Sequence, residues 1–389
     1  MNVLYISNLF PDRQDFNRGL FNARLVRHLV QFCNIRVISP RPGFLFWKTF
    51  TPCNEDMSTN PVYPVVPYVP IWGSRWNHIL MAITLKRAFK NIYSEFKFDI
   101  ALGSWIFPDC CAVARLAQEF KIPFVSTALG TDVHQYINNP TRRNIMLKEL
   151  THCSAIITVS NSLAQILRTA GFPENKIHTI YYGVEQNIFK PGDKSDARKK
   201  LNLPQTAPII LFVGNFLPIK DPLLTIESFN TFIKKYKLSN SLLILIGSGA
   251  LNKKLKQKSS ALGIANNIIF AGKKSPQDIA IYMQSADALC LTSINEGVPN
   301  VVLEALSTGL PVVATRVGGI PEIISDDNLG KLVSGRSPEL IADSIYQIIN
   351  NPLDKNRMIN HSRRYDWNNT AQEYINLLEK SVAGFRSGK

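Results

Sequence analysis

The chain has 389 residues, of which 45% are hydrophobic and 19% charged, and its formal net charge is +15. This composition is typical of a globular protein and excludes a disordered one, and the length favours two domains. The basic balance favours acidic partners such as nucleotides or anionic lipid. The sequence contains neither zinc-ligand spacing nor a ribonucleoprotein motif, so we expect no nucleic-acid partner.

The six cysteines are scattered, and none has C-x-x-C spacing. We therefore expect free thiols in a reducing cytoplasm and no metal site. The first residues lack the basic start of a signal peptide, and no apolar run approaches the ~20 residues of a membrane helix. These observations predict a cytoplasmic protein, with a peripheral position at the inner face of the cell membrane as a second possibility.

The first half of the chain alternates short apolar runs with amphipathic segments, which predicts a parallel α/β sheet. We expect strands at residues 3–6, 36–40, 99–102, 124–127, 155–160 and 177–180. A polar loop after the first strand ends in Gly19, at the start of a helix that runs to about residue 31. A glycine at a helix start allows a phosphate to approach the backbone, and a simple turn is the alternative.

Residues 76–96 predict a basic amphipathic helix. Its apolar face carries Leu85, Phe89, Ile92 and Phe96, whereas Lys86, Arg87, Lys90 and Lys97 lie off that face. Two interpretations stay open: an ordinary helix that covers the sheet, or an element that contacts an anionic membrane surface.

Asp132 follows the strand expected at 124–127, within the segment 128–134. The carboxyl ends of strands are where open α/β sheets bind ligands. Contact of Asp132 with a sugar or an acceptor is one interpretation, and a helix N-cap is the other.

The strand–loop–helix pattern restarts after a polar stretch at 190–207, and we place the domain boundary after residue 190. We expect further strands at residues 209–213, 242–246, 267–271, 288–291 and 311–315. The loop after the first of these contains Asn215 and Lys220, and Gly247 opens a G-x-G turn after the second. A lysine in such a loop can neutralise a diphosphate, although a solvated surface charge is the usual alternative.

The stretch from Glu296 to Glu304 follows the strand expected at 288–291. Glu296 is predicted in the loop at the carboxyl end of that strand. Glu304 is predicted one to two turns into the following helix, on the side that faces the loop. Ionised carboxylates only accept hydrogen bonds, which suits them to sugar hydroxyls.

The start of this helix is a candidate anion site. Pro299 suits the first helical position, so the N–H groups of Asn300, Val301 and Val302 are expected to lack partners within the helix. Such amides, together with the positive helix end, favour a phosphate or a negatively charged leaving group.

These motifs together resemble the retaining glycosyltransferases of family 4, which have the GT-B fold. The two glutamates resemble the E-x7-E signature, the loop 214–221 resembles V-G-R-x-x-x-x-K-G, and residues 182–191 resemble the N-G-V-D…F-x-P hinge. The segment 128–134 resembles H-G-S-D. Asn215 stands where the family has an arginine, and Leu129 stands where a histidine is frequent.

The resemblance implies two Rossmann-like domains that face a cleft. Residues 1–190 would form the acceptor side and residues 191–365 the nucleotide-sugar side, with a helix at about 366–389 crossing back to the first domain. The resemblance also implies roles for single residues. The diphosphate would be held by Lys220, Asn215, Gly19 and the amides of residues 300–302, and Gly247 would lie beside the nucleotide. Glu304 would hold the ribose and Glu296 the donor sugar. Asp132 would face sugar and acceptor.

The implied activity is that of a retaining, metal-independent hexosyltransferase. It would move a sugar from a UDP or GDP donor to a glycan or lipid-linked acceptor in cell-surface polysaccharide or lipopolysaccharide biosynthesis. Neither a metal nor a cofactor is implied, because a lysine and a helix dipole serve the diphosphate. Two alternatives stay open: an enzyme acting on a small soluble sugar, as sucrose and trehalose synthases do, and a non-catalytic module that binds nucleotide sugars.

Overall fold

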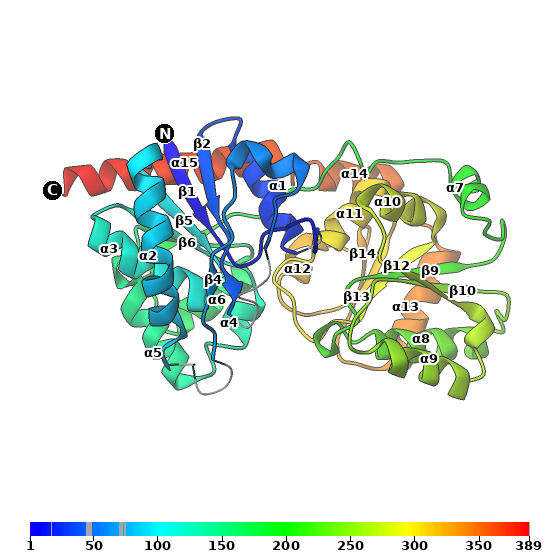
Figure 1. Ribbon diagram of the computed structural model, residues 1–389. Helices are drawn as coiled ribbons and strands as arrows, with labels where there is room; N and C mark the ends of the chain where they lie inside the picture. Colours follow the sequence, from blue (N-terminus) through cyan, green and yellow to red (C-terminus); the bar gives the residue numbers. More distant parts are fainter. Residues whose placement is uncertain (17, 44–48, 70–72, 74, 389) are drawn as a thin grey trace. The chain divides into compact units, whose positions relative to one another are not determined.

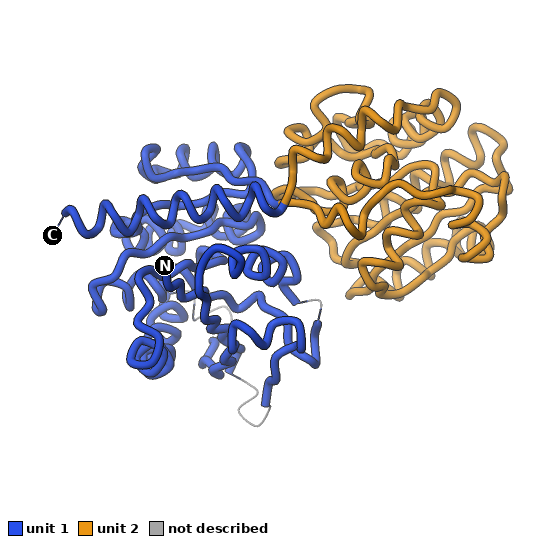
Figure 2. The backbone as a smooth tube through the Cα atoms, turned by 90° about the horizontal axis from the view of Figure 1, so that it is seen from above, with its two compact units in different colours: residues 1–182, 367–389 blue, residues 183–366 orange. Residues whose placement is uncertain are grey.

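The computed structural model describes residues 1–16, 18–43, 49–69, 73 and 75–388. The chain divides into two compact units, drawn in different colours in Figure 2: unit 1 comprises residues 1–182 and 367–389, and unit 2 comprises residues 183–366. The division lies a few residues before the boundary placed after residue 190. The reason is that Phe189 is already buried in unit 2, where its carbonyl accepts a hydrogen bond of 2.5 Å from Ser307 Oγ.

Unit 1 is built on a six-stranded sheet with the order β2-β1-β5-β6-β7-β8, in which all neighbours are parallel (Figure 1). The four central strands, β1, β5, β6 and β7, are almost entirely buried, so they appear in the sequence as continuous apolar runs and not as alternating patterns. The strands are β1 (Asn2–Ile6), β2 (Asn34–Ile38), β5 (Ile100–Ser104), β6 (Phe124–Ala128), β7 (Ala155–Thr158) and β8 (Ile177–Thr179), and a small separate sheet pairs β3 (Arg41–Pro42) with β4 (Val65–Val66).

Helices connect these strands and cover the sheet. From β1 the chain moves one way to β2 and later the other way across the sheet, so right-handed crossovers place α1 and α3 on opposite faces. The helices of unit 1 are α1 (Leu20–Leu29), α2 (Asn77–Phe96), α3 (Cys111–Phe120), α4 (Thr131–His134), α5 (Pro140–Glu149), α6 (Asn161–Thr169) and α15 (Trp367–Ser387), with short turns η1 (Asn54–Thr59), η3 (Ile106–Cys110), η4 (Leu150–His152) and η5 (Glu174–Lys176).

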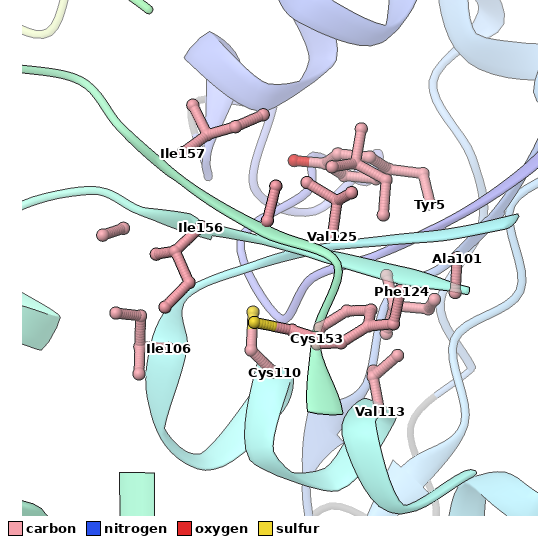
Figure 3. Close-up of a cluster of buried hydrophobic side chains, with 14 of the residues drawn as sticks. Tyr5, Ala101, Ile106, Cys110, Val113, Phe124, Val125, Cys153, Ile156 and Ile157 are labelled. Atoms are coloured by element: carbon pink, nitrogen blue, oxygen red, sulfur yellow. The ribbon is translucent and has the colours of Figure 1, made fainter. Parts of the chain in front are cut away.

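Side chains from neighbouring strands form layers in the core. Figure 3 shows Val125 on the side of Tyr5 and Phe124 on the side of Val113, which belongs to α3. This follows from the register, because Tyr5 pairs with Leu102 and Leu102 pairs with Val125. Successive residues of a strand point to opposite faces, so both faces of this sheet carry a hydrophobic core.

The helix α15 completes unit 1 by packing against α1. Trp367, at its start, is 1% exposed; its ring stacks on His28 at 5.7 Å and lies 5.4 Å from the ring of Tyr182. Thr370 Oγ1 donates a hydrogen bond of 2.9 Å to the carbonyl of Tyr181. Residues that come last in the chain therefore fill the core of the unit that begins it.

Unit 2 has a second six-stranded parallel sheet, with the order β11-β10-β9-β12-β13-β14. This is the strand order of a dinucleotide-binding Rossmann fold, and the direction of winding reverses between β9 and β12. The two parallel α/β units confirm the prediction of two Rossmann-like domains. The strands are β9 (Ile209–Val213), β10 (Leu242–Ile246), β11 (Ile268–Gly272), β12 (Ala288–Leu291), β13 (Val312–Thr315) and β14 (Gly330–Val333).

The helices of unit 2 begin with side-chain caps at several positions. The side chains of Ser275, Ser337 and Asp221 each accept a hydrogen bond from an amide in the first turn of α10, α13 and α8, respectively. These bonds give a partner to amides that have none within the helix. The helices are α7 (Lys194–Lys200), α8 (Pro222–Lys235), α9 (Asn252–Ala261), α10 (Pro276–Ser285), α11 (Asn300–Thr308), α12 (Ile320–Ile323), α13 (Pro338–Asn350) and α14 (Lys355–Ser362), with short turns η6 (Pro218–Lys220) and η7 (Ala265–Asn267).

The chain enters and leaves unit 2 at one place. Val184 forms a parallel bridge with Asp366, and the amide of Val184 donates to the carbonyl of Tyr365 at 2.9 Å. In unit 1, Tyr182 and Trp367 are likewise neighbours. The two passages of the chain between the units are therefore held side by side at both ends.

The basic helix predicted at residues 76–96 is α2, which begins at Asn77. Leu85 and Phe89 are buried, and α2 packs mainly against α3, whereas Ile83 and the preceding Trp76 are 66% and 58% exposed. Within the described ranges, no helix combines the length and the apolar content that crossing a bilayer requires.

Candidate active site

Two loops meet where the strand order of unit 2 reverses. One follows β9 and contains Lys220, and the other follows β12 and contains Glu296. The amide of Ile294 donates to the carbonyl of Ile219 at 2.8 Å, and Thr292 Oγ1 donates to the carbonyl of Asp221 at 2.7 Å. These bonds join the two loops at the edge of the sheet where ligands of such folds bind.

The two loops bring Lys220 and Glu296 into direct contact. Lys220 Nζ lies 2.5 Å from Glu296 Oε1 and 2.6 Å from Oε2, and Ser293 Oγ donates to Oε1 at 2.6 Å. The Glu296 side chain is 7% exposed, whereas that of Lys220 is 26% exposed. A buried carboxylate thus has its charge matched by an ammonium group that a ligand can still reach.

A second layer of contacts holds the Glu296 loop from behind. Thr315 Oγ1 donates to the carbonyl of Ser293 at 2.6 Å, and the amide of Gly319 donates to the carbonyl of Gly297 at 2.8 Å. Gly318 has φ +53°, and a Cβ placed on it would lie 1.8 Å from the carbonyl oxygen of Glu296. This glycine therefore allows two backbone segments to touch.

Arg336 supports the Lys220 loop and was not singled out in the sequence. Its guanidinium forms an ion pair with Asp221, the N-cap of α8, and donates to the carbonyl of Thr292 at 3.3 Å. It follows β14 by a few residues. Its place after the end of a strand is the signal that could have identified it.

The helix α11 begins one residue later than predicted. Pro299 has extended backbone angles and is the N-cap, so Asn300 is the first helical residue. The amide of Val302 donates to the carbonyl of Pro299 at 2.9 Å and is not available to a ligand, which corrects the prediction for that residue. Asn300 and Val301 remain the first-turn amides of this helix start.

Glu304 lies on α11, one turn further along than these amides, and is 8% exposed. The Oδ1 atom of Asn300 is buried without a hydrogen-bond partner among the described residues. A buried acceptor of this kind requires a partner, such as a water molecule or a ligand hydroxyl.

The remaining predicted residues of unit 2 lie on the loops after β9 and β10. Asn215 is exposed. Gly247 has φ +140°, its amide donates to the carbonyl of Gly272 at 2.9 Å, and a Cβ on it would lie 1.9 Å from the carbonyl oxygen of Gly214. Gly247 thus lets the loops after neighbouring strands approach each other.

Gly19 belongs to unit 1, where it is the N-cap of α1 with φ +59°. A Cβ on it would lie 2.2 Å from the carbonyl oxygen of Leu9. The loop that follows β1 therefore packs directly against the start of α1, and a side chain at position 19 would push this loop away from the helix.

Asp132 does not have the exposure expected of a residue that contacts a substrate. It is 0% exposed, and its carboxylate accepts hydrogen bonds from the amides of Ile106, Leu129 and Gly130 at 2.7–3.3 Å. Burial raises its pKa, against the opposing effect of these amides. This placement corrects the expectation that Asp132 faces sugar and acceptor, and it is not the N-cap either, because Gly130 precedes α4 in that position.

Asp109 is a buried carboxyl group that the sequence did not indicate. Its oxygens accept from the amide nitrogen of Asn8 at 2.6 Å and from Asn8 Nδ2 at 2.9 Å. Burial raises its pKa to about 7. Asp109 thus links the loop after β1 to the turn before α3.

Both halves of the chain match known glycosyltransferase families. A family model described as Glycosyl transferases group 1 matches residues 193–365, and one described as Glycosyltransferase Family 4 matches residues 19–187. A D-inositol 3-phosphate glycosyltransferase of Corynebacterium urealyticum is 29% identical over 253 residues, which cover 61% of this chain and 59% of that protein. The chain thus matches a little over half the length of that relative.

Solved structures of similar fold extend over the whole chain. Sucrose-phosphate synthase from Thermosynechococcus elongatus has a TM-score of 0.80 at 18% identity, covering 98% of this chain and 99% of that one. Anabaena HepE, solved in complex with UDP-glucose, has a TM-score of 0.75 at 18% identity, covering 98% and 100%. At this level of identity the likeness establishes the fold.

The contact of Gly318 with Glu296 predicts an effect of a single methyl group. Gly318→Ala should destabilise unit 2 by roughly 1–3 kcal/mol more than Gly263→Ala, because only Gly318 adds a backbone clash. Gly263 is the matched control: its φ is +72°, and a Cβ there meets nothing within 4 Å. Denaturant unfolding measures both variants, and equal losses would contradict the assigned contact.

Proposed function

We propose that the chain acts as a group 1 glycosyltransferase and moves a sugar from a nucleotide-sugar donor to an acceptor, which the glycosyltransferase family models that match residues 193–365 and 19–187 support. The donor binds to unit 2, with the anomeric configuration retained and without a metal ion. The observation that carries the proposal is the contact of Lys220 with Glu296, at the point where the strand order reverses and next to the start of α11.

Charge accounts for the proposed roles. When the bond between the sugar and the diphosphate breaks, negative charge grows on the departing phosphate. The Lys220 ammonium and the first-turn amides of α11 stabilise that charge without moving far. The acceptor hydroxyl forms the new bond on the same face of the sugar, and its proton passes to the departing diphosphate.

The geometry of the pair supports a shared role in donor binding. An ammonium group has three donors, and two of those on Lys220 are used by Glu296. Lys220 can thus contact a phosphate while it still holds the carboxylate. Glu296 then accepts hydrogen bonds from hydroxyls of the sugar, and Glu304 accepts them from the ribose.

We propose a uridine or guanosine diphosphate sugar as the donor, which the UDP-glucose in Anabaena HepE supports for uridine. A glycan or lipid-linked acceptor in cell-surface polysaccharide or lipopolysaccharide biosynthesis is the first candidate. A small soluble acceptor is the second, and the names of the inositol phosphate and sucrose-phosphate relatives support it. The intact lysine–glutamate pair argues against a non-catalytic binding module.

Replacement of Lys220 tests the catalytic part of the proposal. Lys220→Ala should slow turnover by roughly 10²–10³-fold, the scale of losing one preorganised donor. Lys254→Ala, an exposed lysine of α9, is the matched control and should leave turnover unchanged. Steady-state kinetics at saturating donor measure the effect, with thermal unfolding of both variants to show that unit 2 is intact. Normal turnover in Lys220→Ala would remove this residue from the mechanism.

The two glutamates should differ in their effects on binding and on catalysis. Glu304→Gln should weaken the free nucleoside diphosphate by ~1–3 kcal/mol, because a hydrogen bond to a charged group is lost, and should raise KM more than it lowers kcat. Glu296→Gln should lower kcat without weakening the nucleotide, because it leaves the Lys220 ammonium unpaired and available. Calorimetric titration and donor kinetics separate the two effects. A nucleotide affinity lost in Glu296→Gln and kept in Glu304→Gln would reverse the assignment.

We further propose that α2 contacts an anionic membrane surface. It presents exposed Ile83 and the neighbouring Trp76 next to exposed basic side chains, an arrangement that suits the interface of a bilayer.

Vesicle co-sedimentation tests this contact. Replacing Lys86, Arg87 and Lys90 by Gln should reduce binding to anionic vesicles, since each basic residue adds about 1 kcal/mol near such a surface. The control replaces Lys253, Lys254 and Lys258 on α9, which removes the same charge and likewise includes one ion-paired lysine, Lys258 with Glu227, as Lys86 pairs with Glu119. Equal losses in the two triple variants would argue against a specific role of α2.

A further inference from the structure

Unit 1 also has a point where its strand order reverses, between β1 and β5, and a cavity lies there. Its volume is about 220 Å³, and its lining includes Asn8, Arg18, Tyr68, Trp105 and Tyr136. Asn8 follows β1 and Trp105 follows β5, so the cavity opens at the carboxyl ends of the two strands. This is the position where open α/β sheets bind ligands. The volume is below the ~300–1,000 Å³ typical of drug-sized ligands, so it suits a single ring.

Flat aromatic side chains form part of the wall. The rings of Trp105 and Tyr136 meet edge to face at 6.4 Å, and the guanidinium of Arg142 lies 4.3 Å from the ring centre of Tyr136. These contacts hold the rings in place before a ligand arrives. Rigid aromatic faces beside a few polar groups are suited to the C–H face of a sugar or cyclitol ring.

The charge of the lining is positive. It contains two arginines, Arg18 and Arg41, and no carboxylate. Arg41 is 2% exposed and serves the fold: it pairs with Asp12 at 2.7 Å and donates to the carbonyls of Asn8 and Phe10. Its charge is therefore matched within the protein.

Arg18 is different, because its charge faces the cavity. Its Nε donates to the carbonyl of Asn8 at 2.8 Å, and among the described residues its two terminal nitrogens have no partner. The nearby acid, Asp109, is fully buried, and its oxygens are held by Asn8. The planar fork of a guanidinium binds phosphate or carboxylate through two parallel hydrogen bonds.

We propose that this cavity binds the acceptor as a cyclic polyol that carries a phosphate, with the ring against Trp105 and the phosphate on Arg18. The role of this ligand as the acceptor rests on the proposed function, whereas the binding of a polyol phosphate in the cavity does not. The phosphate group belongs either to a free polyol phosphate or to a lipid headgroup, and the two sources share the chemistry that Arg18 recognises.

Calorimetric titration without any donor tests the proposal. The probes are myo-inositol, inositol 1-phosphate and a short-chain phosphatidylinositol below its micelle concentration. Inositol 1-phosphate should bind at least about tenfold more tightly than inositol, the scale of a hydrogen bond to a charged group. If the short-chain lipid binds as well as inositol 1-phosphate, the source is a headgroup, and if only inositol 1-phosphate binds, it is a free phosphate.

Four variants separate the contribution of the phosphate from that of the ring. Arg18→Gln should remove the preference for the phosphorylated probes, and Arg18→Lys should restore part of it. Trp105→Ala should weaken inositol and its phosphate by the same factor. Arg143→Gln, an exposed arginine of α5, removes the same charge and should change neither probe. Thermal unfolding of each variant shows whether unit 1 stays folded.

The proposal is overturned if neither phosphorylated probe binds saturably, if inositol binds as tightly as its phosphate, or if Arg18→Gln binds like wild type. Titration of UDP into the same protein measures nucleotide binding at the proposed donor site of unit 2 separately. Loss of UDP binding with normal polyol phosphate binding would contradict the proposed donor site alone, and the reverse result would contradict the cavity alone.

Discussion

The carboxylate of Glu296 is buried, and the loops of unit 2 are arranged around its pairing with Lys220. Burial of an unpaired charge is costly, so the pairing of Glu296 with Lys220 stabilises the arrangement in which the two loops lie together. Ser293, Thr315 and the backbone contact of Gly318 all hold the Glu296 side of this pair. The requirement of the fold and the requirement of a preorganised donor site therefore coincide at one ion pair.

The two units apply the same topology to different chemistry. Each has a parallel sheet whose winding reverses at its first strand, and each collects polar side chains at the carboxyl ends beside that point. In unit 2 these side chains form a matched pair of opposite charges next to a helix start. In unit 1 they form aromatic walls with one arginine, Arg18, whose terminal nitrogens have no partner in the part of the chain that the structure describes. The fold determines where each site lies, and the residues of the loops determine what it can bind.

Much of this arrangement could be predicted from the sequence, for reasons that also explain what could not. Strands buried on both faces appear as apolar runs, so the two sheets were predictable. Lys220 and Glu296 were each predicted, but their pairing was not, because 76 positions separate them and local patterns carry no information about such contacts. Val302 and Asp132 were misjudged because their polar groups are satisfied by neighbouring backbone, which depends on hydrogen-bond geometry. The domain boundary was placed at the polar stretch 190–207, whereas unit 2 begins at residue 183, because the burial of Phe189 in unit 2 cannot be seen in local composition.

The return of α15 to unit 1 makes unit 2 an insertion within unit 1, and this affects the order of events on the ribosome. The residues of unit 2 are contiguous, so unit 2 can reach its native state while the last helix is still being synthesised. Unit 1, although it is translated first, exposes the surface that receives Trp367 until that helix emerges. The half of the protein made first is therefore the half completed last, and its nascent form carries an apolar surface that a chaperone would recognise.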